Sequence, residues 1–111
     1  MIERNSNMTV DQLIGKVHKR LNGKDFQDRE LAIQVNLTGK IGGVFYIEIR
    51  NGEVSVMPYE YIDNDAIVSV TMTNFDKLVS GRLDLMTNVD AGKIKVEGNL
   101  DKVVLLAELM K

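Results

Sequence analysis

The sequence predicts a single α+β domain that occupies the whole chain, residues 1–111. Apolar side chains recur at helical spacing between residues 10 and 21, and again between residues 100 and 110. Between these segments, runs of alternating apolar and polar residues indicate β-strands, and the dipeptide Asn51-Gly52 marks a hairpin turn. A chain of 111 residues buries enough surface to fold around one core of its own.

Charge and composition narrow the class of protein. The net charge is −2, and Lys and Arg are scattered without a basic stripe, so no nucleic-acid partner is expected. The absence of Cys excludes disulfides and thiolate catalysis. No segment approaches the roughly 20 apolar residues of a membrane-spanning helix, and the first residues lack the apolar core of a signal peptide. These features favour a cytoplasmic protein without integral membrane association.

The N-terminal segment Met1–Asn7 is polar and is expected to be a disordered tail. Thr9 and Gln12 have the spacing of a capping box, which predicts that the first helix begins here. The dipeptide Asn22-Gly23 follows the last apolar residue of the helical pattern and is expected to end this helix.

Four strands are expected in the middle of the chain, at residues 31–38, 44–50, 53–57 and 66–73. The first of them alternates apolar and polar residues, which predicts one buried face and one exposed face. A two-residue turn at Asn51-Gly52 determines the register of the second and third strands. The expected pairs are Arg50 with Glu53, Ile49 with Val54, and Ile47 with Val56.

Loops separate these strands. The glycine-rich segment Gly39–Gly43 is interpreted as a hairpin loop, because a phosphate-binding loop would end in Gly-Lys-Ser/Thr and open a helix. Pro58 cannot donate a ladder hydrogen bond, so the third strand is expected to end there or to lie at a sheet edge. The aromatic and acidic residues of Tyr59–Ile62 are interpreted as a packed loop in preference to a binding site.

Two short helices and a fifth strand are expected next. Thr73 or Asn74 is expected to cap the first of these helices, and Gly81 to close it. A second short helical piece then ends at Gly92. Apolar and charged residues alternate over residues 94–97, which predicts a half-buried strand.

The last helix follows the N-cap residue Asn99 and is apolar on more than one side. A core-facing stripe is predicted from Leu100, Val103, Val104, Ala107 and Met110, with Leu106 beside it. Leu105 and Leu109 form a separate strip. The pattern leaves three interpretations of this strip open: contact with an apolar ligand, contact with another subunit, or packing in a groove of the same domain.

Residues with catalytic or metal-binding chemistry are scarce. His18 is the only His, so a partly exposed helix residue is favoured over a ligand or acid–base role, and no Ser-His-Asp or Cys-His arrangement is possible. The carboxylate pairs, such as Asp63 with Asp65, lie in polar turns, where acids are usually solvated or capping. A non-enzymatic protein without a metal or cofactor is therefore expected.

The order of motifs in the C-terminal part resembles the signature of the sterol carrier protein 2 (SCP-2) lipid-transfer family. A helix ending in glycine, a short second helix, a Gly-Lys-apolar-Lys-apolar-Glu-Gly strand and a final apolar helix follow one another, and the resemblance extends over nearly the whole chain. The matching positions are Gly81, Leu83, Asp84, Gly92, Lys93, Ile94 and Gly98. Leu85 stands where many relatives have Pro, and Thr87-Asn88 replaces a common Ala-Phe.

The resemblance implies a twisted, largely antiparallel five-stranded sheet with helices covering one face. It also implies an apolar tunnel between sheet and helices, and intracellular carriage of a fatty acid, fatty acyl-CoA or sterol-like lipid by a monomer or weak homodimer. The candidate lipid-binding residues are Val79, Leu83, Leu85, Met86, Val89, Ile94, Val103, Leu105, Leu106, Leu109 and Met110.

The composition of the chain is compatible with this function without requiring it. Six Met and only three Phe suggest an interior of adaptable side chains that could yield to a flexible acyl chain. The missing aromatic at Thr87-Asn88 favours flexible acyl chains over rigid sterols. The alternative is a protein interaction or oligomerisation module that keeps the fold and fills its cavity.

Overall fold

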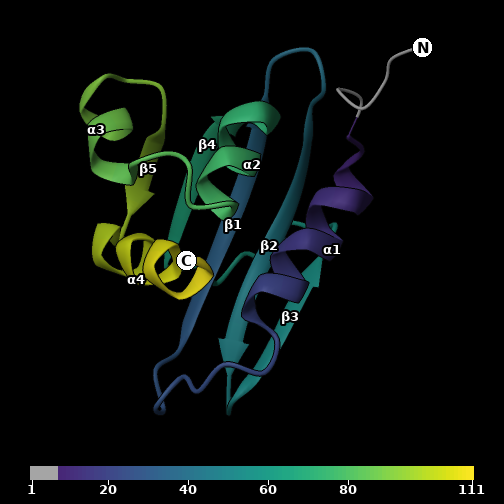
Figure 1. Cartoon of the computed structure of the whole chain (residues 1–111), viewed down its shortest axis with the longest axis vertical. Coiled ribbons are helices and arrows are strands. Elements are labelled where there is room, and N and C mark those ends of the chain that lie inside the picture. The colour runs from purple at the N-terminus through teal and green to yellow at the C-terminus, as the bar shows by residue number, and fades with distance from the viewer. Residues whose placement is uncertain (1–7) are drawn as a thin grey trace.

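The computed structural model describes residues 8–111, so the expected disorder of Met1–Asn7 lies outside the described residues. The elements and their bounds are α1 (Val10–Leu21), β1 (Leu31–Thr38), β2 (Gly43–Arg50), β3 (Glu53–Met57), β4 (Ala66–Thr71), α2 (Met72–Val79), α3 (Leu85–Asp90), β5 (Lys95–Gly98) and α4 (Leu100–Met110). Figure 1 shows the helices in front of a single sheet. The α+β fold class is confirmed.

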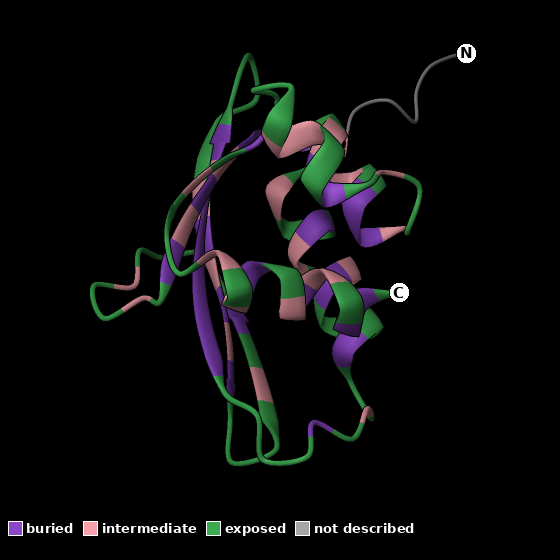
Figure 2. Cartoon of the chain, turned by 90° about the vertical axis from the view of Figure 1, so that its left-hand side faces the viewer, coloured by how far each residue is buried: buried purple, intermediate pink, exposed green. Residues whose placement is uncertain are grey.

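The five strands form one sheet in the order β3-β2-β1-β4-β5. β1 and β4 run parallel, and every other neighbouring pair in the sheet is antiparallel. The helices lie on one side of this sheet (Figure 2), with α1 over β3 and α4 over β1 and β4. The expected largely antiparallel five-stranded sheet with helices on one face is therefore confirmed.

The β2–β3 hairpin has the register that its turn predicts. Asn51 and Gly52 both have positive φ, at +54° and +78°, as a type I′ turn requires. The paired residues include Ile47 with Val56, Ile49 with Val54 and Arg50 with Glu53. The Arg50 side chain, however, forms its ion pair with Glu48 two residues back along the same strand, at 3.2 Å.

The expected single buried face of β1 is wrong for the first half of the strand. Ala32 and Gln34 are only 4% and 7% exposed, although they point away from the helices. The connection between β3 and β4 covers this face: the Tyr61 amide donates to Oε1 of Gln34 at 2.9 Å, and the Asp65 amide donates to the Ala32 carbonyl at 2.7 Å. The Tyr59–Ile62 segment is thus a loop anchored on the sheet, although Ile62 itself is exposed.

The boundary between β4 and α2 lies two residues earlier than the sequence predicts. The N-cap is Thr71, in place of Thr73 or Asn74, and its hydroxyl accepts a hydrogen bond from the Asn74 amide at 3.2 Å. Met72 therefore begins the helix and does not extend the strand. Met72 is buried, and it would face the core whether it ended the strand or began the helix. Its apolar character therefore did not show to which of the two elements it belongs.

α1 begins as predicted, with both hydrogen bonds of the capping box present between Thr9 and Gln12. It ends at Leu21, before Asn22 as C-cap and Gly23 with a φ of +83°. His18 is exposed on this helix, as expected for a residue at the border of the apolar stripe.

The predicted core face of α4 is wrong by part of a turn. The buried residues of this helix are Val103, Leu106, Leu109 and Met110. Val104, placed in the core by the sequence pattern, is 36% exposed, whereas Leu109, placed on the separate strip, is 9% exposed. The helix is apolar almost all round, so its sequence pattern did not specify which side faces the sheet.

Candidate functional site

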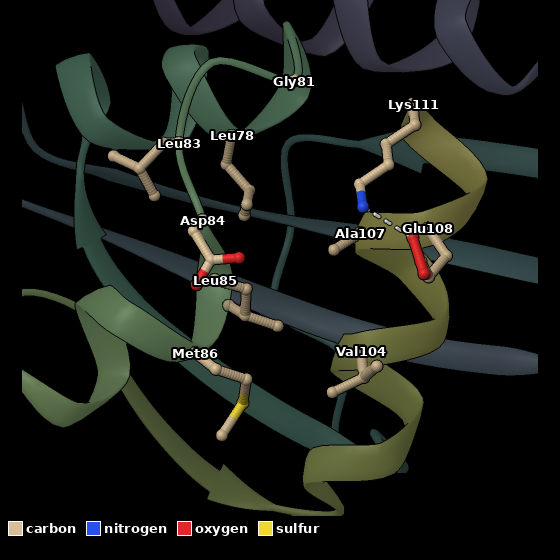
Figure 3. A pocket seen from close by; sticks show the side chains of 10 residues that line it. All are labelled: Leu78, Gly81, Leu83, Asp84, Leu85, Met86, Val104, Ala107, Glu108 and Lys111. Carbon is tan, nitrogen blue, oxygen red and sulfur yellow. Dashed lines mark ion pairs between the residues drawn. The ribbon is translucent and has the colours of Figure 1, made fainter.

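An apolar groove lies between α4 and the segment that joins α2 to α3. Its volume is about 190 Å³, and Figure 3 shows side chains from the two sides facing one another. The lining residues are Leu78, Gly81, Leu83, Asp84, Leu85, Met86, Val104, Ala107, Glu108 and Lys111. The groove is partly open to solvent, so these ten residues do not by themselves enclose a tunnel.

The glycine at the end of α2 positions one wall of this groove. Gly81 has a φ of +73°, and the Arg82 amide donates back to the Lys77 carbonyl at 2.8 Å. This Schellman motif reverses the chain, so that the segment carrying Leu83 and Leu85 runs along the side of the groove opposite α4.

α3 then begins at the groove edge. Asp84 is its N-cap, and Oδ2 of Asp84 accepts hydrogen bonds from the Thr87 amide at 2.9 Å and from the Thr87 hydroxyl at 2.6 Å. These two bonds hold the pKa of Asp84 below its usual value, with the Thr87 hydroxyl as the larger cause. The carboxylate at the groove edge is therefore ionised at neutral pH.

The walls combine buried and exposed apolar side chains. Leu78 and Leu85 are buried at the base, whereas Met86 and Val104 are 41% and 36% exposed at the sides. Exposed apolar surface of this kind is unfavourable in water and is stabilised when another apolar group covers it. The groove can therefore accept a hydrocarbon group between α3 and α4.

The mouth of the groove carries charge. Nζ of Lys111 lies 2.9 Å from Oε2 of Glu108, and this bond, followed by the charge of Asp84, raises the pKa of Lys111. Lys24, three residues after the end of α1, donates to the carbonyl oxygen of Lys111 at 2.8 Å. The last turn of α4 is thus held both by its own ion pair and by Lys24.

The structure divides the sequence-predicted lipid-binding residues into two groups. Leu83, Leu85 and Met86 line the groove. The others belong to the core between helices and sheet, fully buried at Val79, Ile94, Val103, Leu106, Leu109 and Met110, and partly buried at Val89 and Leu105. Of the motif residues, Gly81 and Asp84 line the groove, whereas Gly92, Lys93 and Gly98 do not.

Sequence reasoning missed Leu78, Val104, Ala107, Glu108 and Lys111 as groove residues. Three of them on α4 and its C-cap residue Lys111 recur at positions i, i+3, i+4 and i+7, which place them on one face of a helix. That spacing was visible in the sequence, but Val104 and Ala107 were assigned to the core face. The charged pair Glu108 and Lys111 on the same face was the signal that this side faces solvent.

Residues 8–111 contain no group of three or more His, Asp or Glu side chains that could hold a metal ion. None of the helices in this range is long and apolar enough to cross a bilayer.

Comparison with known sequences identifies one family model that matches almost the entire chain. The model of the alkyl sulfatase C-terminal domain matches residues 3–111. Among curated proteins, hydroxysteroid dehydrogenase-like protein 2 of Mus musculus is 26% identical over 102 residues, which are 91% of this chain. The human protein of the same name is 31% identical over 75 residues, or 67% of this chain. The chain spans about a fifth of these relatives, 21% and 18% of their lengths.

Solved structures give the same fold. A double mutant of the sec-alkyl sulfatase Pisa1 from Pseudomonas sp. superposes with a TM-score of 0.76 at 20% identity, over 92% of this chain but 16% of that chain. Palmitated SCP2L2 from Aedes aegypti superposes with a TM-score of 0.70 at 21% identity, over 93% of this chain and 95% of that chain. The chain belongs to the alkyl sulfatase C-terminal family, and its fold is that of the sterol carrier protein 2 proteins.

Proposed function

We propose that this domain binds an apolar lipid by its hydrocarbon chain, in the groove between α4 and the α2–α3 segment. The observation that carries the proposal is the pair of exposed apolar side chains, Met86 and Val104, on opposite sides of a groove with a buried leucine base. Covering them with a hydrocarbon chain removes apolar surface from water, at roughly 25 cal/mol per Å².

The groove favours part of a flexible chain over a rigid ligand. Its volume of about 190 Å³ is smaller than the roughly 300–1,000 Å³ of pockets that enclose drug-sized ligands. Aromatic side chains are absent from its lining, so no flat surface is present to stack on a sterol ring system. A fatty acid or fatty acyl chain would lie partly in the groove, or would enter more deeply if α4 moved outward.

Similarity to SCP-2 proteins supports a lipid ligand. The SCP2L2 protein of Aedes aegypti is described as palmitated, and this chain covers 95% of its length. We extend from it only the ligand class, a long hydrocarbon chain. This chain covers only 16% of the sulfatase and 21% of the dehydrogenase-like protein, so we propose a carrier role for this domain and not their activities.

Filling the groove tests this function. Ala107→Phe places a ring in the groove and should abolish binding of a fluorescent acyl lipid, because ring and chain compete for the same space. Ala91→Phe adds the same ring at an exposed position at the end of α3, outside the lining, and should bind like the unmodified protein. Fluorescence titration measures both affinities. Equal lipid affinities of the two variants would show that the groove is not the lipid-binding site.

The small volume of the groove is also compatible with the alternative function, an interaction module. If a partner protein instead of a lipid covers the exposed Met86 and Val104, the protein should self-associate or be purified without a bound lipid. Native mass spectrometry of protein purified without detergent separates the two functions, since retained lipid and subunit number appear in one spectrum.

A further inference from the structure

The connection between β3 and β4, residues 58–65, projects from the side of the sheet opposite the helices (Figure 2). Tyr61 holds this β3–β4 loop in place, because its ring packs edge-on against Tyr46 with the ring centroids 4.9 Å apart. The Tyr61 hydroxyl donates to Glu48, and the Asn64 side-chain amide donates to the Tyr61 carbonyl oxygen at 2.7 Å. The loop is therefore ordered before any partner binds, which lowers the entropy cost of binding.

The tip of this loop carries apolar and acidic side chains. Ile62 is 95% exposed and Tyr59 is 59% exposed, the two largest values among the exposed large apolar side chains of residues 8–111. Glu60 and Asp63 lie on either side of Ile62 in the sequence and are exposed as well. Apolar surface of this kind is unfavourable in water and is stabilised when a partner covers it.

The β3–β4 loop covers only part of the open face of the sheet, the face that points away from the helices. Next to the covered part, the strand register places four side chains in one row on this face: Val44, Asn36, Ser69 and Lys95. A hollow of about 440 Å³ lies here, and its lining residues are Thr38, Ser69, Gly92, Lys93 and Lys95. The lining contains two ammonium groups and no carboxylate, so the hollow suits an acidic group.

The loop and the hollow carry opposite charges. Within residues 8–111, none of the four charged side chains at the two sites forms an ion pair: Glu60, Asp63, Lys93 and Lys95. A partner of one charge sign would be attracted to one site and repelled by the other. A second copy of the same face presents both signs, and it can therefore satisfy both sites.

Neighbouring charges do not cancel this separation. Two cations lie near the loop. Arg50 already pairs with Glu48 at 3.2 Å, and Lys102 donates to a backbone carbonyl oxygen. Near the hollow, Glu97 is on the same face of β5 as Lys95, but it lies outside the lining.

We propose that the open face of the sheet binds a second copy of this chain, with the β3–β4 loop of each copy in the hollow of the other. Because loop and hollow lie on one face, a two-fold rotation brings both pairs together at once, and the association closes as a dimer. Ile62 is then covered, and the acids beside it lie near Lys93 and Lys95. The groove on the helix side stays free, so this inference does not rest on lipid binding.

Sedimentation equilibrium of the full chain at low ionic strength, where charges are least screened, measures the dimerisation constant. Glu60→Lys and Lys95→Glu each make both contacts of the dimer repulsive, and each should weaken dimerisation at least about tenfold. Both residues are exposed, so the melting temperatures should not change. Lys19→Glu makes the same charge reversal on α1, on the helix side, and should keep the dimerisation constant of the unmodified protein.

Mixing Glu60→Lys with Lys95→Glu tests the pairing itself. In the mixed dimer, the reversed loop of one copy meets the reversed hollow of the other, and the second contact is the original one. The mixture should therefore dimerise within about threefold of the unmodified protein, although each variant alone does not. Ile62→Ser removes the apolar tip without changing charge and should also weaken dimerisation at least about tenfold.

Three results would overturn this dimer. The first is an unmodified protein that stays monomeric up to about 1 mM. The second is a dimer that Glu60→Lys and Ile62→Ser leave unchanged, because its interface would then lie elsewhere, such as at the exposed Met86 and Val104 of the groove. The third is a mixture of the two charge-reversal variants that dimerises no better than either variant alone. None of these results changes the lipid affinity that tests the proposed function.

Discussion

The backbone amide of Arg82 donates to the carbonyl oxygen of Lys77 at 2.8 Å, across the positive-φ residue Gly81. The same relationship recurs eleven residues later, where the Lys93 amide donates to the Asn88 carbonyl at 2.9 Å across Gly92. These two Schellman motifs end α2 and α3. They hold the intervening segment, which carries Leu83 and Met86, in place along one side of the groove.

Substitution of Gly92 should destabilise the fold through its backbone conformation alone. No atom lies within 4 Å of an added Cβ, but the φ of +77° is strained for any residue with a β-branched side chain. Gly92→Val should lower the free energy of unfolding by about 1–3 kcal/mol, measured by urea denaturation. Gly15→Ala in α1 is the control, because the space is equally open there and φ is negative; it should stabilise by about 0.4–1 kcal/mol.

Gly98 should tolerate substitution less well than Gly92. A Cβ at this position would lie 2.6 Å from the backbone oxygen of Asp65, and φ is +98°. Backbone cannot move aside as a side-chain tip can, so the steric clash adds to the conformational strain. Gly98→Ala should cost about 3 kcal/mol or more by the same denaturation measurement. A loss no larger than that of Gly92→Ala would show that β5 shifts easily relative to β4.

The sequence predicted those parts of the fold that depend on neighbouring residues. The capping box at Thr9, the turn at Asn51-Gly52 and the helix ends at Gly81 and Gly92 each rest on a local backbone requirement. Each of them is present in the structure. Local signals of this kind do not depend on which elements pack against each other, and this is why they could be read directly.

The sequence could not predict features that depend on packing between distant segments. Val103 is buried and Val104 lines the groove, but α4 is apolar on nearly every side, and the sequence marks the difference weakly, through the charged pair Glu108 and Lys111 on the face of Val104. The buried side chain of Gln34 likewise depends on the loop that brings the Tyr61 amide to it, 27 residues later. Most of the candidate site therefore became visible only when α4 was placed against the α2–α3 segment.

The Asp84 cap should make the stability of the protein depend on pH in the acid range. The Thr87 hydroxyl and amide lower the pKa of Asp84 below its usual 3.8. A carboxyl whose pKa is lower in the folded state stabilises that state above the unfolded pKa, and this contribution is lost as the pH falls through the folded pKa. The difference in the free energy of unfolding between the unmodified protein and Asp84→Ala should therefore be largest at neutral pH and should shrink as the pH falls below 3.8.

Urea denaturation at a series of pH values measures this difference. Thr87→Val removes the hydroxyl donor, which is the largest cause of the lowered pKa, and should reduce the pH dependence while Asp84 is still present. If the difference between unmodified protein and Asp84→Ala were the same at acid and neutral pH, the Asp84 carboxylate would not be the group that stabilises α3.

A charge introduced on α4 should act differently on its two apolar sides. Val104→Glu puts a carboxylate at a half-exposed position in the groove and should weaken lipid binding at least about tenfold, with a melting temperature within about 4 °C of the original. Leu109→Glu buries the same charge in the core and should cost about 3 kcal/mol or more. Calorimetric titration and thermal denaturation separate these effects. If Leu109→Glu kept normal stability but lost lipid binding, Leu109 would line the groove and Val104 would not, contrary to the structure.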